Sequence, residues 1–196
     1  MTAKATLCEA LDRHDVRAIV IGGSAGGIDA MRVLTPALAT DVPVLVVLHV
    51  APETSSDWSK VLAPSALVVR EAEDKERAVP GTLFVAPPDY HLLVDGEGTL
   101  SLSVEAAVHH ARPSIDVLFE SAAWAYGSQL LGIVLSGANS DGAEGLAKIR
   151  RKGGLCWVQS PESAATPTMP RAALSAVPDA CSLTLEQMTE VFRARA

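Results

Sequence analysis

Cysteine is scarce in this sequence of 196 residues, with Cys8, Cys156 and Cys181 lying far apart along the chain. An odd number of widely spaced cysteines forms neither a disulfide framework nor a CxxC metal knuckle. Reduced thiols of this kind are typical of cytosolic proteins. We therefore expect a cytoplasmic protein without structural disulfides.

Basic residues are also fewer than acidic ones. The sequence has 16 lysines and arginines and 23 aspartates and glutamates, which gives a formal net charge of -7. A protein that binds nucleic acid or an anionic membrane surface normally presents a basic face. The longest apolar run, residues 42–48, is far shorter than the ~20 residues of a membrane span. Residues 1–15 carry several charges and lack the apolar stretch of a signal peptide. We expect no nucleic-acid partner and no membrane insertion.

What the sequence does contain is an alternation of short β-branched runs with helix-length segments. This alternation is typical of a parallel sheet with helices on both faces. Domains of about 150 residues are common, so a chain of 196 residues is expected to form one domain. We predict a single α/β domain over residues 1–196, built on a doubly wound, mostly parallel sheet.

The individual elements follow from these runs. Strands are expected at residues 17–21, 42–50, 66–69, 81–86, 91–94, 99–104, 130–135 and 155–159. Helices are expected from residue 28, at 56–62, 114–126 and 141–152, and from a capping box at Thr184 and Gln187. Ser114 is expected to cap the helix that runs to residue 126. Because two glycines lie in the turn between them, the strands at 91–94 and 99–104 should form an antiparallel hairpin at an edge of the sheet.

Three polar residues stand where predicted strands end: Ser24, His49 and Asp141. Ligands bind open parallel sheets outside the carboxyl ends of the strands, so these side chains should converge. A hydroxyl becomes nucleophilic when a base takes its proton and a carboxylate orients that base. We therefore take these three residues as candidate catalytic residues.

Plainer interpretations remain open for the same positions. A histidine such as His49 is more often a satisfied buried side chain, and Asp141 is suited to capping the helix that follows it. The glycine-rich segment 22–27 fits G-x-S-x-G, but a dinucleotide phosphate loop is the alternative. That fingerprint would need glycine in place of Ser24. An ordinary α/β-hydrolase fold is disfavoured, because its triad runs in the order Ser, Asp, His.

The remaining histidines show no metal-binding spacing. His109 and His110 are adjacent, so their side chains would diverge on a regular element, and no HxH or HExxH pattern is present. His14 and His91 are expected to be surface or packing residues. The sequence therefore predicts neither a metal site nor a cofactor.

Six ordered blocks of the chain match a known family. They are IGGSAGG (21–27), LHVAP (48–52), GTLFVAPPDYHLLV (81–94), RPSIDVLFESAAWAYG (112–127), LSGANSDGAEGL (135–146) and MPRAAL (169–174). On these blocks the chain resembles the catalytic domain of the CheB-type chemotaxis-receptor protein-glutamate methylesterases. The resemblance runs from about residue 17 to 177, nearly the whole chain.

The resemblance implies a function and assigns roles to residues. It makes Ser24 the nucleophile, His49 the base and Asp141 the orienting acid, the three residues that the strand ends had already indicated. It implies hydrolysis of glutamate methyl esters on methyl-accepting chemoreceptors, and deamidation of particular receptor glutamines through the same acyl-enzyme. It implies no metal and no organic cofactor.

Departures from the family pattern concern the wall of the site and its regulation. Ala25 stands where the family often has threonine, and Ala138 and Asn139 replace the methionine and glycine of a T-G-M-G-x-D loop. We take Ala25 and Ala138 as candidates for the oxyanion site or the substrate wall. The family's receiver domain is not expected in the short segment before residue 17, so control would come from elsewhere, with a separate receiver protein as one candidate partner, or be absent.

Two other functions stay open at this stage. A non-catalytic adaptor of a chemosensory pathway would explain the changes at Ala25 and Ala138. An esterase or deamidase acting on a protein outside chemotaxis would use the same three catalytic residues.

Overall fold

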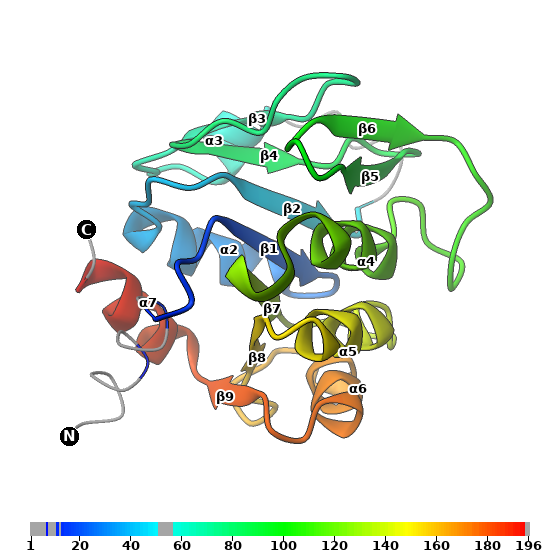
Figure 1. Ribbon diagram of the computed structural model, residues 1–196. Coiled ribbons are helices and arrows are strands. Elements are labelled where there is room, and N and C mark those ends of the chain that lie inside the picture. Colours follow the sequence, from blue (N-terminus) through cyan, green and yellow to red (C-terminus); the bar gives the residue numbers. More distant parts are fainter. Residues whose placement is uncertain (1–6, 8–10, 12, 51–56, 195–196) are drawn as a thin grey trace.

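The computed structural model, which describes residues 7, 11, 13–50 and 57–194, is organised around a seven-stranded sheet (Figure 1). The strand order is β3-β4-β2-β1-β7-β8-β9, and every neighbouring pair is parallel. The strands are β1 (Ala18–Gly23), β2 (Val44–Leu48), β3 (Val68–Glu71), β4 (Thr82–Val85), β7 (Leu130–Val134), β8 (Leu155–Gln159) and β9 (Cys181–Leu183). The predicted parallel sheet is confirmed.

Helices cover both faces of this sheet, as the doubly wound prediction requires (Figure 1). One face packs against α2 (Gly27–Leu34), α3 (Trp58–Val61) and α7 (Leu185–Arg193). The other packs against α4 (Ile115–Tyr126), α5 (Ala143–Arg151) and α6 (Thr168–Ala176). Side chains of β1 alternate between the two cores: Ile19 and Ile21 lie in the first, Ala18 and Val20 in the second. Both faces are buried, which explains why the strands read as continuous apolar runs.

The predicted hairpin is present as β5 (His91–Val94) and β6 (Leu100–Ser103), paired antiparallel. It forms a two-stranded sheet of its own and does not extend the parallel sheet, in which β3 is the neighbour of β4. The reason lies in its side chains. Leu92, Val94 and Leu100 are buried in the core beside α4, so the hairpin covers a face of the fold and leaves the edge to β3.

Several boundaries differ from the sequence prediction. β1 runs through Gly22 and Gly23, where we expected the glycines to end it, and β9 and α6 were not among the predicted elements. The capping box of α7 is confirmed, with Thr184 and Gln187 bonded to one another's backbone amides. Cys8 and the part of LHVAP beyond residue 50 lie outside the described residues. Among the described helices, none is long and apolar enough to cross a membrane.

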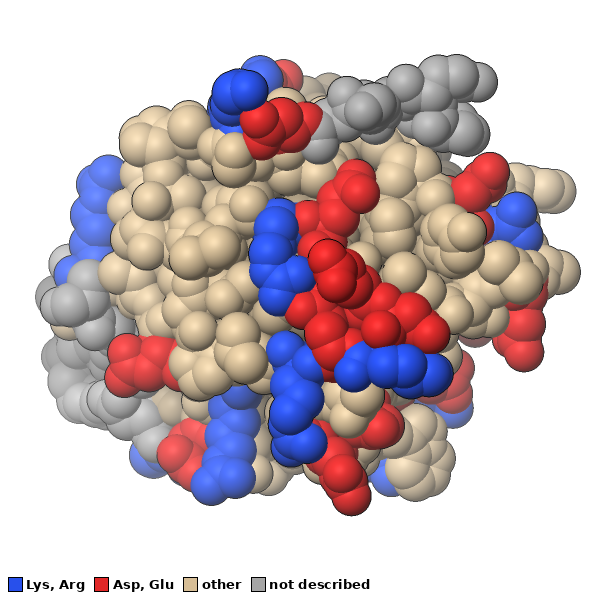
Figure 2. All heavy atoms as spheres, turned by 90° about the horizontal axis from the view of Figure 1, so that it is seen from above, with Lys and Arg blue, Asp and Glu red and all other residues tan. Residues whose placement is uncertain are grey.

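Acidic side chains gather on the face above β3 and the hairpin, with basic side chains beside them (Figure 2). The sequence predicts a solvated loop at residues 71–77, and this loop is largely exposed. It is also tied to its surroundings: Arg70 pairs with Glu76 and lies 4.7 Å above the ring of Phe84, and the amide of Leu102 donates to Asp74 (2.9 Å). The loop thus anchors the hairpin to β3.

The strand order brings together the segments that carry the candidate site. β1 lies between β2 and β7, so the carboxyl ends of these strands are neighbours at the point where the chain changes direction across the sheet. Backbone bonds extend the pairing past the strands: the amide of His49 donates to Gly23 O (3.0 Å), and that of Ser24 to Ser136 O (2.9 Å). The three candidate residues therefore follow three adjacent strands.

Candidate active site

Asp141 lies fully buried at the centre of the site and accepts four hydrogen bonds. Its Oδ1 accepts from the Ser114 hydroxyl (2.9 Å) and the Asp116 amide (3.0 Å). Its Oδ2 accepts from the Ile115 amide (2.7 Å) and faces Nε2 of His49 at 2.9 Å. The carboxylate thus caps the amino end of α4 while it holds the histidine.

These contacts keep Asp141 ionised although it is buried. Burial by itself raises the pKa of this carboxyl, but the hydrogen bonds from His49 and from the amides of Asp116 and Ile115 outweigh it, so the pKa lies below its ordinary value. The positive end of the helix dipole acts in the same direction. Asp141 is therefore a fixed negative charge beside the imidazole.

This arrangement corrects two expectations about helix capping. Asp141 does not cap the helix after it, because α5 begins behind Gly142, whose φ of 95° only glycine adopts readily. It caps α4 instead. Ser114 precedes α4 as expected, but its side chain makes no capping bond and donates to Asp141. One carboxylate has taken over the role predicted for the serine.

His49 follows β2 and has one ring nitrogen available for chemistry. Its side chain is 14% exposed, and its contact with Asp141 joins Nε2 to the carboxylate. An ionised carboxylate only accepts hydrogen bonds, so Nε2 carries the proton and Nδ1 keeps its lone pair. Within the described residues Nδ1 has no hydrogen-bond partner. The alternative of a fully satisfied buried histidine does not describe this side chain.

Ser24 lies in the turn between β1 and α2. β1 is the neighbour of β2, which His49 follows, and of β7, which precedes the loop of Asp141. It is half-buried, and its hydroxyl makes no hydrogen bond to the part of the chain that the structure describes. The turn is possible because Gly26 adopts a φ of 81°, where a Cβ would also approach the Ser136 side chain to 2.9 Å. The amides of Ala25 and Gly26, at the amino end of α2, are likewise unbonded among described residues. A hydroxyl and two open amide donors thus share one turn.

A second serine, Ser114, is excluded as a nucleophile by its surroundings. It is fully buried, and its hydroxyl is used by Asp141. The nearby His91 accepts from the backbone amide of Ser114 through Nδ1 (3.1 Å), and its Nε2 lies 3.1 Å from Ala106 O. Both ring nitrogens are engaged, which confirms the expectation that His91 is a packing residue.

The loop after β7 forms one wall of the site. Ala138 is exposed there, and Asn139 accepts the amide of Asp141 through its side-chain oxygen (3.2 Å). The hydroxyl of Ser136 donates to the carbonyl of Ala25 (2.7 Å), which ties this loop to the turn of Ser24. Ala25 and Asn139, two of the residues at which the chain departs from the family pattern, therefore take part in the contacts that hold these loops.

A pocket of about 610 Å³ opens beside His49 and contains side chains that sequence reasoning missed. His109, His110 and Arg112 line it together with Asp89. We expected the two adjacent histidines to diverge on a regular element, but both have positive φ, 49° and 64°, and form a tight turn. Pro113 disfavours helical backbone at Arg112, so it indicates that a regular helix would end close to this turn.

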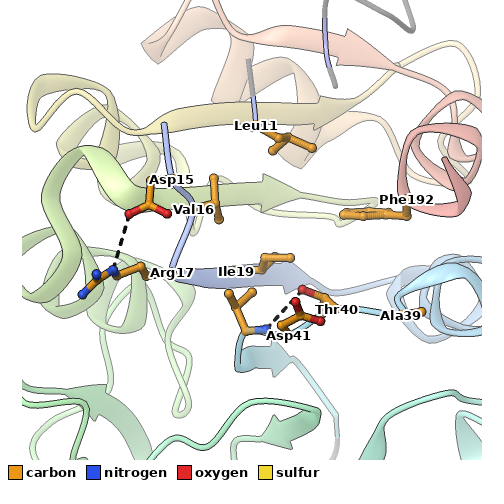
Figure 3. Close-up of a pocket in the computed structure, with 10 residues that line it drawn as sticks. Leu11, Asp15, Val16, Arg17, Ile19, Ala39, Thr40, Asp41 and Phe192 are labelled. Atoms are coloured by element: carbon orange, nitrogen blue, oxygen red, sulfur yellow. Dashed lines mark hydrogen bonds and ion pairs between the residues drawn. The ribbon is translucent and has the colours of Figure 1, made fainter. Parts of the chain in front are cut away.

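Another pocket, of about 390 Å³, lies near the starts of β1 and β2, at the end of the sheet away from the candidate site (Figure 3). Leu11 and Phe192 contribute apolar side chains, and Asp15 pairs with Arg17 at 3.7 Å. The hydroxyl of Thr40 accepts the amide of Val42 there (3.3 Å), and no histidine is among the described residues that line the pocket. No group of three or more metal-ligating side chains was found among the residues that could be described.

Comparisons with known proteins agree with this geometry. The profile of the CheB methylesterase family matches residues 19–192. A Symbiobacterium thermophilum protein-glutamate methylesterase/protein-glutamine glutaminase is 38% identical over 163 residues, which are 82% of this chain and 45% of that protein. A Leptospira interrogans protein with a provisional form of this name is 45% identical over 178 residues, 89% of this chain and 92% of that protein. The Thermotoga maritima CheB methylesterase catalytic domain superposes with a TM-score of 0.86 and 27% identity, covering 92% of this chain and 99% of that one.

Proposed function

The chain belongs to the CheB methylesterase family, and we propose that it hydrolyses protein glutamate methyl esters with Ser24 as the nucleophile. The observation that carries the proposal is the His49–Asp141 pair, 2.9 Å apart, at the strand end next to the turn of Ser24. The pair supplies a base and a charge that orients it. Ser24 supplies a hydroxyl that makes no hydrogen bond to any described residue.

In the first half of the reaction, Nδ1 of His49 takes the Ser24 proton as Oγ attacks the ester carbonyl. The developing imidazolium is stabilised by Asp141, which is ionised and held by α4. The open amides of Ala25 and Gly26 bind the oxyanion of the tetrahedral intermediate. His49 then returns the proton to the methoxy group, and methanol leaves an acyl-enzyme on Ser24.

In the second half, water replaces methanol. His49 takes a proton from water, the hydroxide attacks the acyl carbonyl, and the Ser24 oxygen leaves with the proton that His49 returns. The products are free glutamate and the restored hydroxyl. A glutamine side chain would follow the same route with ammonia as the leaving group, which is the deamidation that the family name includes. The route is complete with side chains and backbone amides and calls on no cofactor.

The family implies the protein partners. We propose that the substrates are methylated side chains of chemoreceptors in the cytoplasm, and that a separate receiver protein regulates the enzyme. The single α/β domain over residues 1–196 predicted from the sequence is the unit that would carry out the reaction. Many relatives are about twice as long as the segment that matches this chain.

Labelling with a fluorophosphonate probe, combined with methanol release, tests the proposal. The probe should modify Ser24, as located by peptide mass spectrometry, and methylated receptors should release methanol. Ser24→Ala should abolish labelling and lower kcat by about 10⁶, as loss of the nucleophile does in other serine hydrolases. Methanol release that survives in Ser24→Ala contradicts the mechanism. A wild-type protein that neither reacts nor releases methanol would be the adaptor instead.

A further inference from the structure

We infer that His109, His110 and Arg112 form an anion-binding rim for an acidic peptide substrate, with a second carboxylate bound beside the glutamate ester. The inference rests on the proposed function, because it assigns a substrate class to that same site. The rim and His49 line one pocket of about 610 Å³, so a peptide bound for catalysis would also reach the rim.

The backbone of the rim is a tight turn at which histidine is unusual. Val108 and Ala111 exchange both amide hydrogen bonds, 3.1 and 2.9 Å long, which makes His109 and His110 the two central residues. Both have positive φ, as in a type I′ turn, where asparagine and glycine are the ordinary residues. Strained residues of this kind cluster at functional sites. The turn presents two imidazoles to the pocket at a conformational cost.

Arg112 adds a permanent positive charge beside the turn. Its guanidinium donates to the carbonyl oxygens of Val104 (3.0 Å) and Glu105 (3.2 Å), which carry no net charge, and it forms one long ion pair with the exposed Asp89 at 3.5 Å. Its side chain is 30% exposed, so a ligand can reach it. A guanidinium with N–H groups to spare is the side chain best suited to a carboxylate.

Two acidic groups face the rim and set its charge. Asp89 lines the same pocket, but it is 60% exposed and lies 3.5 Å from the guanidinium of Arg112. Asp116 lies beneath the turn, with Oδ2 3.5 Å from Nε2 of His109 and without a hydrogen-bond partner in the described part of the chain. With both histidines protonated, the rim has an excess of positive charge on a chain whose net charge is negative.

The experiment compares two peptides that each carry one glutamyl methyl ester. In one the neighbouring residues are glutamates, and in the other they are glutamines. At pH 6 and low salt, wild-type kcat/KM should be about fivefold higher for the acidic peptide, the upper end of what an exposed charge pair contributes. The ratio should fall when salt is added and when the pH is raised to 8, because histidine loses its charge in that range.

Variants of the turn separate recognition from folding. His109→Asn combined with His110→Asn keeps residues that accept positive φ and removes the imidazole charges, so the ratio should drop below about twofold. His110→Lys should keep the preference at pH 8, and lysine tolerates the conformation, since Lys75 has a φ of 66° in this chain. His14→Asn, at a histidine remote from the pocket, is the matched control and should retain the wild-type ratio.

A ratio of one in the wild type, or an unchanged ratio in the double variant, overturns the rim. If the wild type cleaves neither peptide, the proposed function fails and the rim is judged by binding alone. An acidic peptide without the ester is then titrated while the imidazole proton resonances are followed by NMR. Shifts at His109 and His110 with the acidic peptide, but not with its glutamine counterpart, support the rim. Equal or absent shifts reject it.

Discussion

Asp141 holds His49 through Oδ2, the same oxygen that accepts the first amide of α4, so one buried carboxylate serves both the candidate base and the fold. The helix supplies amide donors that keep the carboxylate ionised and fix its position. The carboxylate in turn fixes the tautomer of the imidazole. Catalytic geometry and helix stability are therefore expected to change together when this residue is altered.

Asp141→Asn should lower both activity and stability. The neutral amide cannot stabilise an imidazolium, so kcat should fall by about 10⁴, as in other triads. The NH₂ group of the asparagine also replaces one carboxylate oxygen, so it faces hydrogen-bond donors and cannot accept from them. The loss of these bonds should lower the unfolding free energy by about 1–3 kcal/mol. Methanol release and urea titration measure the two effects. An active variant with unchanged kcat would remove Asp141 from the mechanism.

Ser114→Ala is the matched test of the supporting contact. It removes one of four hydrogen bonds to Asp141 and leaves the charge and the His49 contact in place. We expect a loss of about 1 kcal/mol in unfolding free energy and a decrease in kcat of less than about tenfold. The comparison with Ser24→Ala, assayed for methanol release in parallel, identifies the nucleophile. An inactive but folded Ser114→Ala protein would reverse the assignment of the two serines.

The parallel sheet and the three strand-end residues could be predicted because each depends on local information. Buried central strands require apolar residues on both faces, and a strand such as β2 has no other stable place than the middle of a sheet. Once the strands were recognised, Ser24, His49 and Asp141 followed from the rule that parallel strands end at one edge.

Other features depend on contacts between distant residues, which no local pattern contains. Asp141 caps a helix that begins 26 positions earlier, at Ile115, because the fold places β7 beside it. The turn of His109 and His110 needs two positive φ values that propensity assigns to asparagine and glycine. The hairpin was recognised, but its place on the sheet face was decided by where Leu92 could be buried.

Asp116 and Asp141 should give stability opposite dependences on pH. Burial and repulsion from Asp141 raise the pKa of Asp116 to about 6 from 3.8. The folded protein therefore binds this proton more tightly than the unfolded chain, and the contribution of Asp116 to stability declines between about pH 4 and pH 6. The lowered pKa of Asp141 gives stability that is present above about pH 4 and is lost as the pH falls.

Asp116→Asn should remove the decline, so the variant gains unfolding free energy relative to the wild type more at pH 7 than at pH 4.5. Urea titrations at both values check this. Asp95→Asn should behave in the opposite way. The hydrogen bond from the Thr99 amide lowers the pKa of Asp95, so the variant should lose more unfolding free energy at pH 7 than at pH 4.5. Identical pH dependence in the wild type and Asp116→Asn would show that this carboxyl does not titrate as described.

Gly142→Ala should disturb the site through the backbone. Gly142 has a φ of 95°, and a Cβ there would lie 2.7 Å from Cγ2 of Ile115, the residue whose amide Asp141 accepts. Strain of this kind costs about 1–3 kcal/mol, and relief by movement of the loop would displace the Asp141 carboxylate. We expect lower unfolding free energy in urea together with lower kcat. Gly96→Ala is the control, since a Cβ there meets nothing within 4 Å, and it should change stability by less than about 1 kcal/mol. Equal losses in the two variants would mean that the close approach of Gly142 to Ile115 does not restrict the loop.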